Sequence, residues 1–149
     1  MTTPAAASWV RAATPEDWNG IERLLTDSHL PTAGVREHLS AFVVATKGAA
    51  LLGCAGIERY GDVGLLRSVS VTENLGGRGV GAELVRAVLD RARALGLREV
   101  FLLTTTAVRY FPRFGFETIG REALPSSLAA SEELRGACPA SAVAMRLTL

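Results

Sequence analysis

Four glycines and one arginine lie close together near the middle of this chain, in the segment Gly76-Gly77-Arg78-Gly79-Val80-Gly81. An apolar strand pattern precedes the segment and an amphipathic helix pattern follows it. The first N–H groups of a helix have no intrahelical partner and carry positive partial charge. Glycines let an anion approach these groups closely, and Arg78 adds a full positive charge. The segment therefore predicts a pyrophosphate site, whereas the simpler interpretation is a tight turn between strand and helix.

The spacing of apolar residues predicts the elements that position this segment. Leu65 to Val71 alternates as a strand, and Val80 to Leu95 repeats as a helix that ends before Gly96. A buried strand over 99–104 comes next, so the two strands are expected to be parallel neighbours joined by the helix. Further strands are expected over 9–13, 42–45, 50–60, 116–119 and 142–147, and further helices over 14–28, 35–40, 106–111 and 124–134.

The composition is that of a globular protein, and the order of the expected strands and helices is that of an α/β (α+β) fold; we expect one domain over residues 1–149 with residues 1–7 flexible. The net charge of +1 gives no support for binding nucleic acid or an anionic membrane surface. Neither a secretory signal nor a membrane span is recognisable, so a cytoplasmic location is expected. Cys54 and Cys138 lie far apart without metal-ligand spacing. We expect two reduced thiols that pack in the core, and no metal.

The position of the glycines separates the chain from two common phosphate-binding folds. They follow the fourth expected strand, whereas a Rossmann fingerprint follows the first. Their spacing is G-x-G-x-G, and no Gly-Lys-Ser/Thr follows, which excludes a P-loop.

With these elements in place, the chain resembles the GNAT superfamily of acyl-CoA-dependent N-acetyltransferases over nearly its whole length. The family motif R/Q-x-x-G-x-G/A is similar to the segment from Gly76 to Gly81. The family pattern A-x-x-x-Y-x-K/R-x-G-F is similar to the segment from Ala107 to Phe116. The blocks LPTAGVREHL, LLRSVSV, LLTTTA, YFPRFGF and CPASAVAMRL also resemble a branch known as arsenic-resistance N-acetyltransferases.

The resemblance implies acetyl-CoA as co-substrate and a central sheet of about six or seven strands, mostly antiparallel, that splays between strands 4 and 5. The pantetheine arm would pair with the fourth strand, and the N–H of Val71 would stabilise the oxyanion formed at the thioester. The amine would attack the thioester directly. The residues implied in co-substrate binding are Val69, Ser70, Val71, Gly76, Gly77, Arg78, Gly79, Val80, Gly81, Ala82, Thr104 and Phe111.

Three positions depart from the family pattern. Gly76 replaces an arginine or glutamine, and Thr104 stands where an asparagine is frequent. Phe111 stands where the family has the tyrosine that protonates the departing thiolate, and Tyr110 is one residue earlier. One residue on a helix corresponds to a rotation of about 100°. Either Tyr110 takes over through local distortion at Pro112, or no tyrosine acts.

No residue in the sequence is an unambiguous general base, and Glu58 is our first candidate, with Glu73 weaker. Arg67 interrupts an apolar strand, which is costly unless the charge is paired or faces a cleft. We hypothesise that it meets a carboxylate of the acceptor, and the alternative is a structural ion pair. Further acceptor-binding candidates are Arg59, His38 and Arg109.

These features favour an N-acetyltransferase for a small, carboxylate-bearing amine. If the branch resemblance extends to substrate, the acceptor is an amino-acid analogue such as a glutamate-mimicking organoarsenical. Two alternatives stay open: a non-catalytic acyl-CoA-binding or regulatory domain, and an acetyltransferase for protein N-termini or lysines. A monomer or a homodimer is expected.

Overall fold

Seven strands form one sheet in the part of the chain that the computed structural model describes, residues 9–72, 79–131 and 141–149. The strand order is β1-β2-β3-β4-β5-β7-β6, and only the pair β4 and β5 is parallel. The predicted mixed, mostly antiparallel sheet is confirmed. The strands are β1 Val10–Ala12, β2 Phe42–Lys47, β3 Ala50–Tyr60, β4 Val63–Val71, β5 Glu99–Thr104, β6 Glu117–Ile119 and β7 Val143–Thr148.

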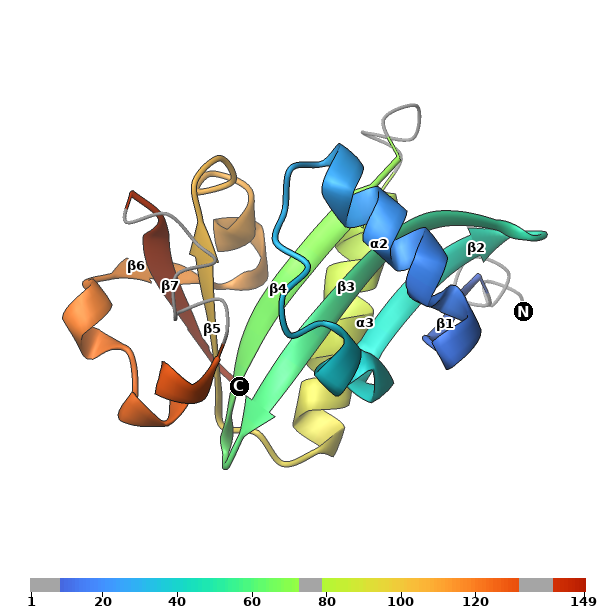
Figure 1. The fold of residues 1–149 in the computed structure, drawn as a ribbon. Helices are drawn as coiled ribbons and strands as arrows, with labels where there is room; N and C mark the ends of the chain where they lie inside the picture. Colours follow the sequence, from blue (N-terminus) through green and yellow to red (C-terminus); the bar gives the residue numbers. More distant parts are fainter. Residues whose placement is uncertain (1–8, 73–78, 132–140) are drawn as a thin grey trace, which may run out of the picture.

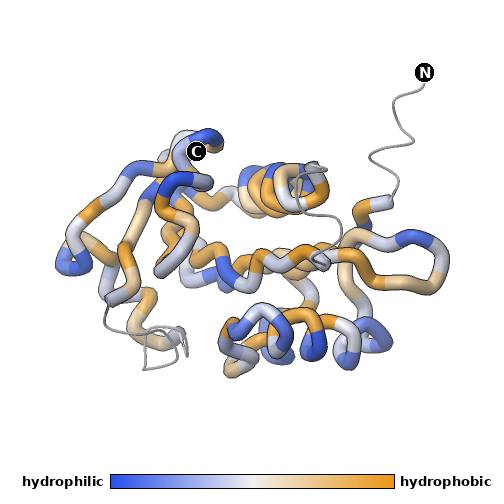
Figure 2. Tube along the Cα trace, turned by 90° about the horizontal axis from the view of Figure 1, so that it is seen from above, coloured by the Kyte–Doolittle hydropathy of each residue, from blue (hydrophilic) through white to orange (hydrophobic). Residues whose placement is uncertain are grey.

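Two α-helices cover opposite faces of the sheet (Figure 1). They are α2, Trp18–Asp27, and α3, Val80–Ala94. Figure 2 shows the resulting three layers, with apolar residues turned toward the sheet between the helices. Short 3-10 helices complete the described part: η1 Pro15–Asp17, η2 Arg36–Ala41, η4 Phe111–Phe114, η5 Arg121–Ala123 and η6 Ser126–Ala130.

The largest core cluster lies between α3 and the sheet. Its helical members recur at the spacing that puts side chains on one face, namely Val80, Leu84, Val85, Val88, Leu89 and Ala92. A second cluster joins α2 to the other face, through Ile21, Leu24, Leu25, Phe42, Val44 and Cys54. Cys54 is buried, and burial raises the pKa of its thiol to about 12. The apolar face of each helix is buried against the sheet, and this fixes the layers. The layers in turn place the end of β4 near the start of α3.

Most predicted bounds agree with the structure within about two residues. The turn after β5 differs from the helix expected over 106–111, because the Thr104 hydroxyl accepts the Ala107 N–H at 3.0 Å. The helical turn then begins later, at η4, with Pro112 in its first turn. The predicted helix over 124–134 is the short η6, and its last three residues lie outside the described part of the chain, as do residues 1–7.

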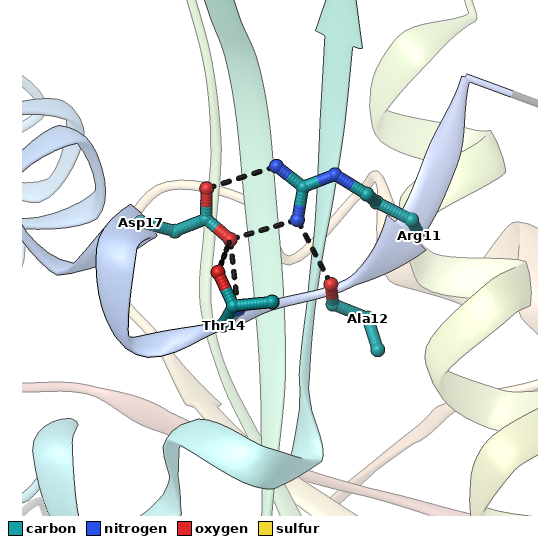
Figure 3. A network of polar contacts seen from close by, with 4 residues as sticks. All are labelled: Arg11, Ala12, Thr14 and Asp17. Atoms are coloured by element: carbon teal, nitrogen blue, oxygen red, sulfur yellow. Dashed lines mark hydrogen bonds and ion pairs between the residues drawn. The ribbon is translucent and has the colours of Figure 1, made fainter.

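The entry to α2 is held by a polar network around Asp17, shown in Figure 3. Its carboxylate accepts hydrogen bonds from Arg11 at 2.8 and 2.9 Å and from the Thr14 N–H at 2.8 Å. The Thr14 hydroxyl also donates to Asp17 at 3.2 Å, and the two residues form a capping box at the start of η1. The Arg11 hydrogen bond outweighs partial burial and lowers the pKa of Asp17 to about 2. The network ties β1 to the start of the helical layer.

We expect Asp17→Asn to lower the free energy of unfolding by about 1 kcal/mol at neutral pH, because a capping acceptor and an ion pair are weakened together. The pKa of this carboxyl is about 2 when folded and 3.8 ordinarily. Its stabilisation is therefore complete above about pH 4 and is lost as the pH falls toward about 2. Urea unfolding across this range measures it. Glu16→Gln in the same helical turn is the control, and equal effects of both variants would contradict the assignment.

Candidate active site

A cleft of about 1020 Å³ opens where β4 separates from β5. Its walls are the loop 29–33 after α2, the second half of β4, the first turn of α3, and the chain from Leu102 to Arg113. The parallel pairing of β4 with β5 covers only three residue pairs, from Val63↔Glu99 to Leu65↔Phe101. Beyond Leu65 the two strands have no pairing, so the predicted splay between strands 4 and 5 is confirmed.

The amide of Val71 faces this opening. The Thr72 N–H donates to the Leu52 carbonyl at 2.9 Å, so the pair Thr72–Leu52 is hydrogen-bonded. In an antiparallel ladder the neighbouring pair, Val71↔Gly53, then directs its backbone groups away from the partner strand. The N–H and carbonyl of Val71 therefore point from β4 toward the β5 side, where a bound ligand can meet them.

A β-bulge lies in the middle of β4, beside the cleft. Three steps along β4, from Arg67 to Ser70, face two steps along β3, from Gly56 to Cys54. Ser68 takes up the extra residue in the left-handed region, with φ of 63°. Bulges bend a strand and re-aim side chains, and they are frequent beside active sites. This bulge turns the end of β4 away from β5, and no feature of the sequence predicted it.

The first turn of α3 forms another wall of the cleft. Gly79 is its N-cap at φ of 81°, and no side chain caps the helix. The first intrahelical bond runs from the Glu83 N–H to the Gly79 carbonyl, so the N–H groups of Val80, Gly81 and Ala82 precede it without a helical acceptor. A Cβ atom at Gly81 would lie only 3.2 Å from the Tyr110 hydroxyl. Lack of a side chain at this position keeps the cleft open beside these donors.

Tyr110 and Phe111 both line the cleft, but they differ in their surroundings. Phe111 is 7% exposed and belongs to the core cluster, where its ring meets Phe116 edge-on. The Tyr110 hydroxyl instead reaches the start of α3, and the Arg113 guanidinium lies 4.3 Å from its ring centroid. Burial raises the pKa of Tyr110, although the charges of Arg113 and Arg86 oppose the shift. Tyr110 is thus the tyrosine of this wall that can carry a proton at neutral pH.

Glu58 and Arg67 form an ion pair of 2.6 Å in which the side chains are 1% and 0% exposed. They are neighbours on the α2 face of the sheet. Arg67 also donates to the carbonyls of Ala33 and Pro31 at 2.6 and 3.0 Å, and to the Ser68 hydroxyl at 2.9 Å. Arg67 thereby ties the cleft loop to β4, and the structural ion pair considered as the alternative is present.

The environment of Glu58 argues against the predicted general base. Glu58 does not line the cleft, and the Tyr60 hydroxyl donates to it at 2.7 Å. Burial alone would raise its pKa, but hydrogen bonds from Ser131, Tyr60 and Arg67 outweigh burial and lower the pKa. A sealed carboxylate with a lowered pKa is a weak acceptor of a substrate proton. The same burial corrects the expected direct contact of Arg67 with an acceptor carboxylate, because its side chain has no exposed surface.

Three further residues predicted near the acceptor lie apart from the cleft that the described residues form. Arg59 and Arg109 are exposed, and the His38 ring packs against Tyr60 at 5.8 Å between centroids. None of the three lines the cleft. Thr104 does line it, as do Val69, Ser70 and Val71 from β4. Predictions for Gly76, Gly77, Arg78, Glu73 and Cys138 lie outside the described residues.

Sequence reasoning missed two ionisable residues of the cleft, His29 and Arg113. His29 follows α2 at φ of 58°, where glycine is the usual residue, so no glycine marked this helix end. Arg113 donates from Nε to the Tyr110 carbonyl at 2.8 Å. In the sequence, Arg113 is marked by the K/R position of the family pattern A-x-x-x-Y-x-K/R-x-G-F. Elsewhere, no described helix could span a bilayer, and the described residues contain no cluster of potential metal ligands.

Comparison with known proteins agrees with this geometry. The model of the acetyltransferase (GNAT) family matches residues 4–116. The chain belongs to the GNAT acetyltransferase family. The described end of the glycine motif, residues 79–81, lies at the start of α3, and the second motif surrounds η4; both segments contribute to the cleft.

Curated relatives are amino-acid acetyltransferases. One from Azotobacter vinelandii is 31% identical over 129 residues, which is 80% of this chain and 30% of the relative. One from Neisseria meningitidis is 27% identical over 95 residues, which is 62% of this chain and 22% of the relative. The chain thus spans less than a third of the length of these relatives. These relatives do not show the arsenic-resistance branch that the sequence blocks resemble.

Solved structures share the fold. The N-acetylglutamate synthase from Neisseria gonorrhoeae, complexed with coenzyme A and N-acetyl-glutamate, superposes with a TM-score of 0.80 at 23% identity, covering 94% of this chain and 34% of that one. Rv2747 from Mycobacterium tuberculosis, in complex with CoA and NLQ, has a TM-score of 0.77 at 24% identity, covering 94% and 98%. The GNAT fold predicted for this sequence is confirmed.

The sealed ion pair generates a stability prediction. We expect Glu58→Gln to lower the free energy of unfolding by about 3–5 kcal/mol, because it removes the carboxylate charge that lies 2.6 Å from the buried Arg67 guanidinium. Urea unfolding at neutral pH measures the change. Glu117→Gln is the matched control, since its carboxylate is 74% exposed and only 3.9 Å from Arg146, and we expect a change within about 0.5 kcal/mol. A loss below about 1 kcal/mol for Glu58→Gln would contradict the buried pair.

Proposed function

We propose that this protein is an acetyl-CoA-dependent N-acetyltransferase that acts on the amine of a small amino-acid-like acceptor. The observation that carries the proposal is the opening between β4 and β5, which brings the outward amide of Val71 and the uncapped start of α3 to one cleft. Membership of the GNAT family supports this assignment. The names and bound molecules of the relatives give the substrate class proposed for this chain.

The cleft suits acetyl-CoA as co-substrate. The N–H groups of Val80, Gly81 and Ala82 offer donors for a pyrophosphate, and no Cβ at Gly81 obstructs them. The edge of β4 offers backbone groups to a pantetheine arm, as an added strand would use them. Solved relatives of the same fold contain coenzyme A. Gly76, Gly77 and Arg78, which precede this helix start, are proposed to complete the site.

Transfer needs an oxyanion donor and a proton for the departing thiolate. We assign the first role to the Val71 N–H, which faces the opening and is held by the β3 ladder on its other side. We assign the second to Tyr110, whose hydroxyl lies at the start of α3 and whose raised pKa keeps it protonated at neutral pH. Phe111, at the usual family position, packs in the core and closes the cleft floor.

The acceptor would enter against the loop 29–33. Two carbonyls of this loop are fixed by Arg67, so Arg67 shapes the acceptor wall from behind. The relatives named amino-acid acetyltransferases favour an α-amino acid. The finer proposal of a glutamate-mimicking organoarsenical rests on the resemblance of sequence blocks alone. Both acceptors carry an amine beside a carboxylate, so one cleft suits either.

We expect the purified chain to release free thiol from acetyl-CoA with at least one acceptor of a panel made of glutamate, glutamine, arginine and an arsenical glutamate analogue. Mass spectrometry of the acetylated acceptor confirms transfer rather than hydrolysis. A peptide with a free N-terminus is the control for the protein-acetylating alternative. Thermal stabilisation by coenzyme A without turnover of any acceptor or peptide would favour a non-catalytic acyl-CoA-binding domain.

Tyr110→Phe is expected to lower kcat by about 10²-fold with a smaller change in the KM for acetyl-CoA, because it removes the proton donor but keeps the ring. Gly81→Ala places a methyl group against the same hydroxyl and is expected to lower kcat as well. In the double variant the two effects should be far from additive, since both act through one oxygen atom. Steady-state kinetics measures all three. A wild-type kcat in Tyr110→Phe would contradict this role and would mean that solvent protonates the thiolate.

A further inference from the structure

Acetyl transfer to an amine needs a group that removes a proton from the acceptor nitrogen. An amino acid carries an ammonium group at neutral pH, and nitrogen must lose a proton before it can attack a thioester. Glu58, the carboxylate expected for this task, is sealed in the ion pair with Arg67. The inference that follows deepens the proposed function and rests on it.

Four residues with ionisable side chains line the cleft within the described part of the chain: His29, Arg67, whose side chain is itself buried, Tyr110 and Arg113. The two guanidinium groups stay protonated in proteins and accept no proton. Burial raises the pKa of Tyr110, so this hydroxyl is a proton donor at neutral pH. An imidazole is the side chain suited to accept a proton in this range, and His29 is the histidine of the cleft.

The backbone at His29 is unusual and firmly held. The Leu30 N–H donates to the Leu25 carbonyl at 2.8 Å, and the His29 N–H donates to the Thr26 carbonyl at 3.1 Å. These two bonds form a Schellman motif, which ends α2 with His29 at its left-handed position. A side chain with a Cβ is uncommon there and costs conformational energy. A histidine thus occupies a position that glycine usually takes at a helix end.

Both sides of His29 are anchored to β4. Before it, the hydroxyls of Ser28 and Ser70 lie 2.6 Å apart and form a hydrogen bond. After it, Arg67 holds the Pro31 and Ala33 carbonyls at 3.0 and 2.6 Å. Ser70 and Arg67 flank the bulge of β4, close to the outward amide of Val71. The backbone of His29 is thus held on the loop side of the cleft, where this exposed residue forms part of the lining, and Tyr110 and α3 form another wall.

We propose that His29 is the general base of acetyl transfer, which takes the proton from the acceptor ammonium directly or through one water molecule. The freed lone pair on nitrogen then bonds to the thioester carbonyl carbon, and the carbon–sulfur bond breaks as coenzyme A leaves as a thiolate. Tyr110 supplies the proton for sulfur and regains one when the amide nitrogen loses its second proton. His29 passes its proton to solvent, so one proton is released in each turnover.

His29→Asn and His29→Gly distinguish the contribution of the imidazole from that of the left-handed backbone conformation. Both residues accept a left-handed conformation, so both variants should melt at or above the wild-type temperature. We expect kcat/KM for the acceptor to fall about 10²-fold at neutral pH in each, with the KM for acetyl-CoA little changed. Added imidazole should restore part of the activity of His29→Gly. Glu22→Gln, on the exposed face of α2, is the control with wild-type kinetics.

The pH profile distinguishes a base from a residue that only shapes the loop. Wild-type kcat/KM should show an acidic limb, a fall in rate as the pH is lowered, because a base that is already protonated cannot take the proton of the acceptor. In His29→Gly this limb should disappear, and the rate should climb with hydroxide. Arg67 from β4 and Tyr110 and Arg113 from the η4 segment are the other ionisable residues that line the cleft in the described part of the chain, and none of them is a proton acceptor at neutral pH.

Two results would overturn the proposal. If kcat/KM of both variants stays within about threefold of wild type, His29 is not the general base. A loss of activity that imidazole does not restore, with the acidic limb still present, would make His29 a positioning residue. Product formation by the wild-type protein tests the proposed acetyltransferase by itself, whereas the ratio of variant to wild-type rates tests His29.

Discussion

Beyond Leu65, strand β4 has a partner strand on only one side. Unpaired backbone groups inside a sheet are costly unless water or a ligand satisfies them. The left-handed residue Ser68 turns the strand so that its end runs along an open cleft instead of along β5. The rest of the site depends on this divergence, because it exposes the Val71 amide and leaves room between β4 and the start of α3.

The divergence is stabilised on the opposite face by a polar unit buried beneath the cleft loop. Arg67 joins the Glu58 carboxylate of β3 to two loop carbonyls, and Glu58 is also bonded by Tyr60. A buried ion pair contributes little net stability by itself, but breaking one partner is costly. The pair therefore acts as a constraint on shape: β3, β4 and the acceptor loop keep one arrangement. It explains why a charged residue is tolerated in an otherwise apolar strand.

The two sides of the cleft have different chemical characters. The α3 side offers backbone donors and the hydroxyl of Tyr110, which suits an anionic co-substrate and a leaving thiolate. The loop side offers His29, anchored by bonds on both sides. Separation of proton donor and proton acceptor onto opposite walls is what an acyl transfer needs, since each proton moves at a different atom.

The sequence by itself determined the layers, the strand order around α3 and the family. Apolar periodicity and glycine positions are local signals, and burial of one face of each element leaves few alternatives. Only the tertiary structure decided the roles of charged residues: Glu58 and Arg67 pair with each other, while Arg59, His38 and Arg109 lie away from the cleft. The pairing of Glu58 with Arg67 depends on the register between β3 and β4, which shifts at one extra residue that no local pattern signals. The end of α2 has a histidine at the left-handed position instead of a glycine, so no local signal marked His29.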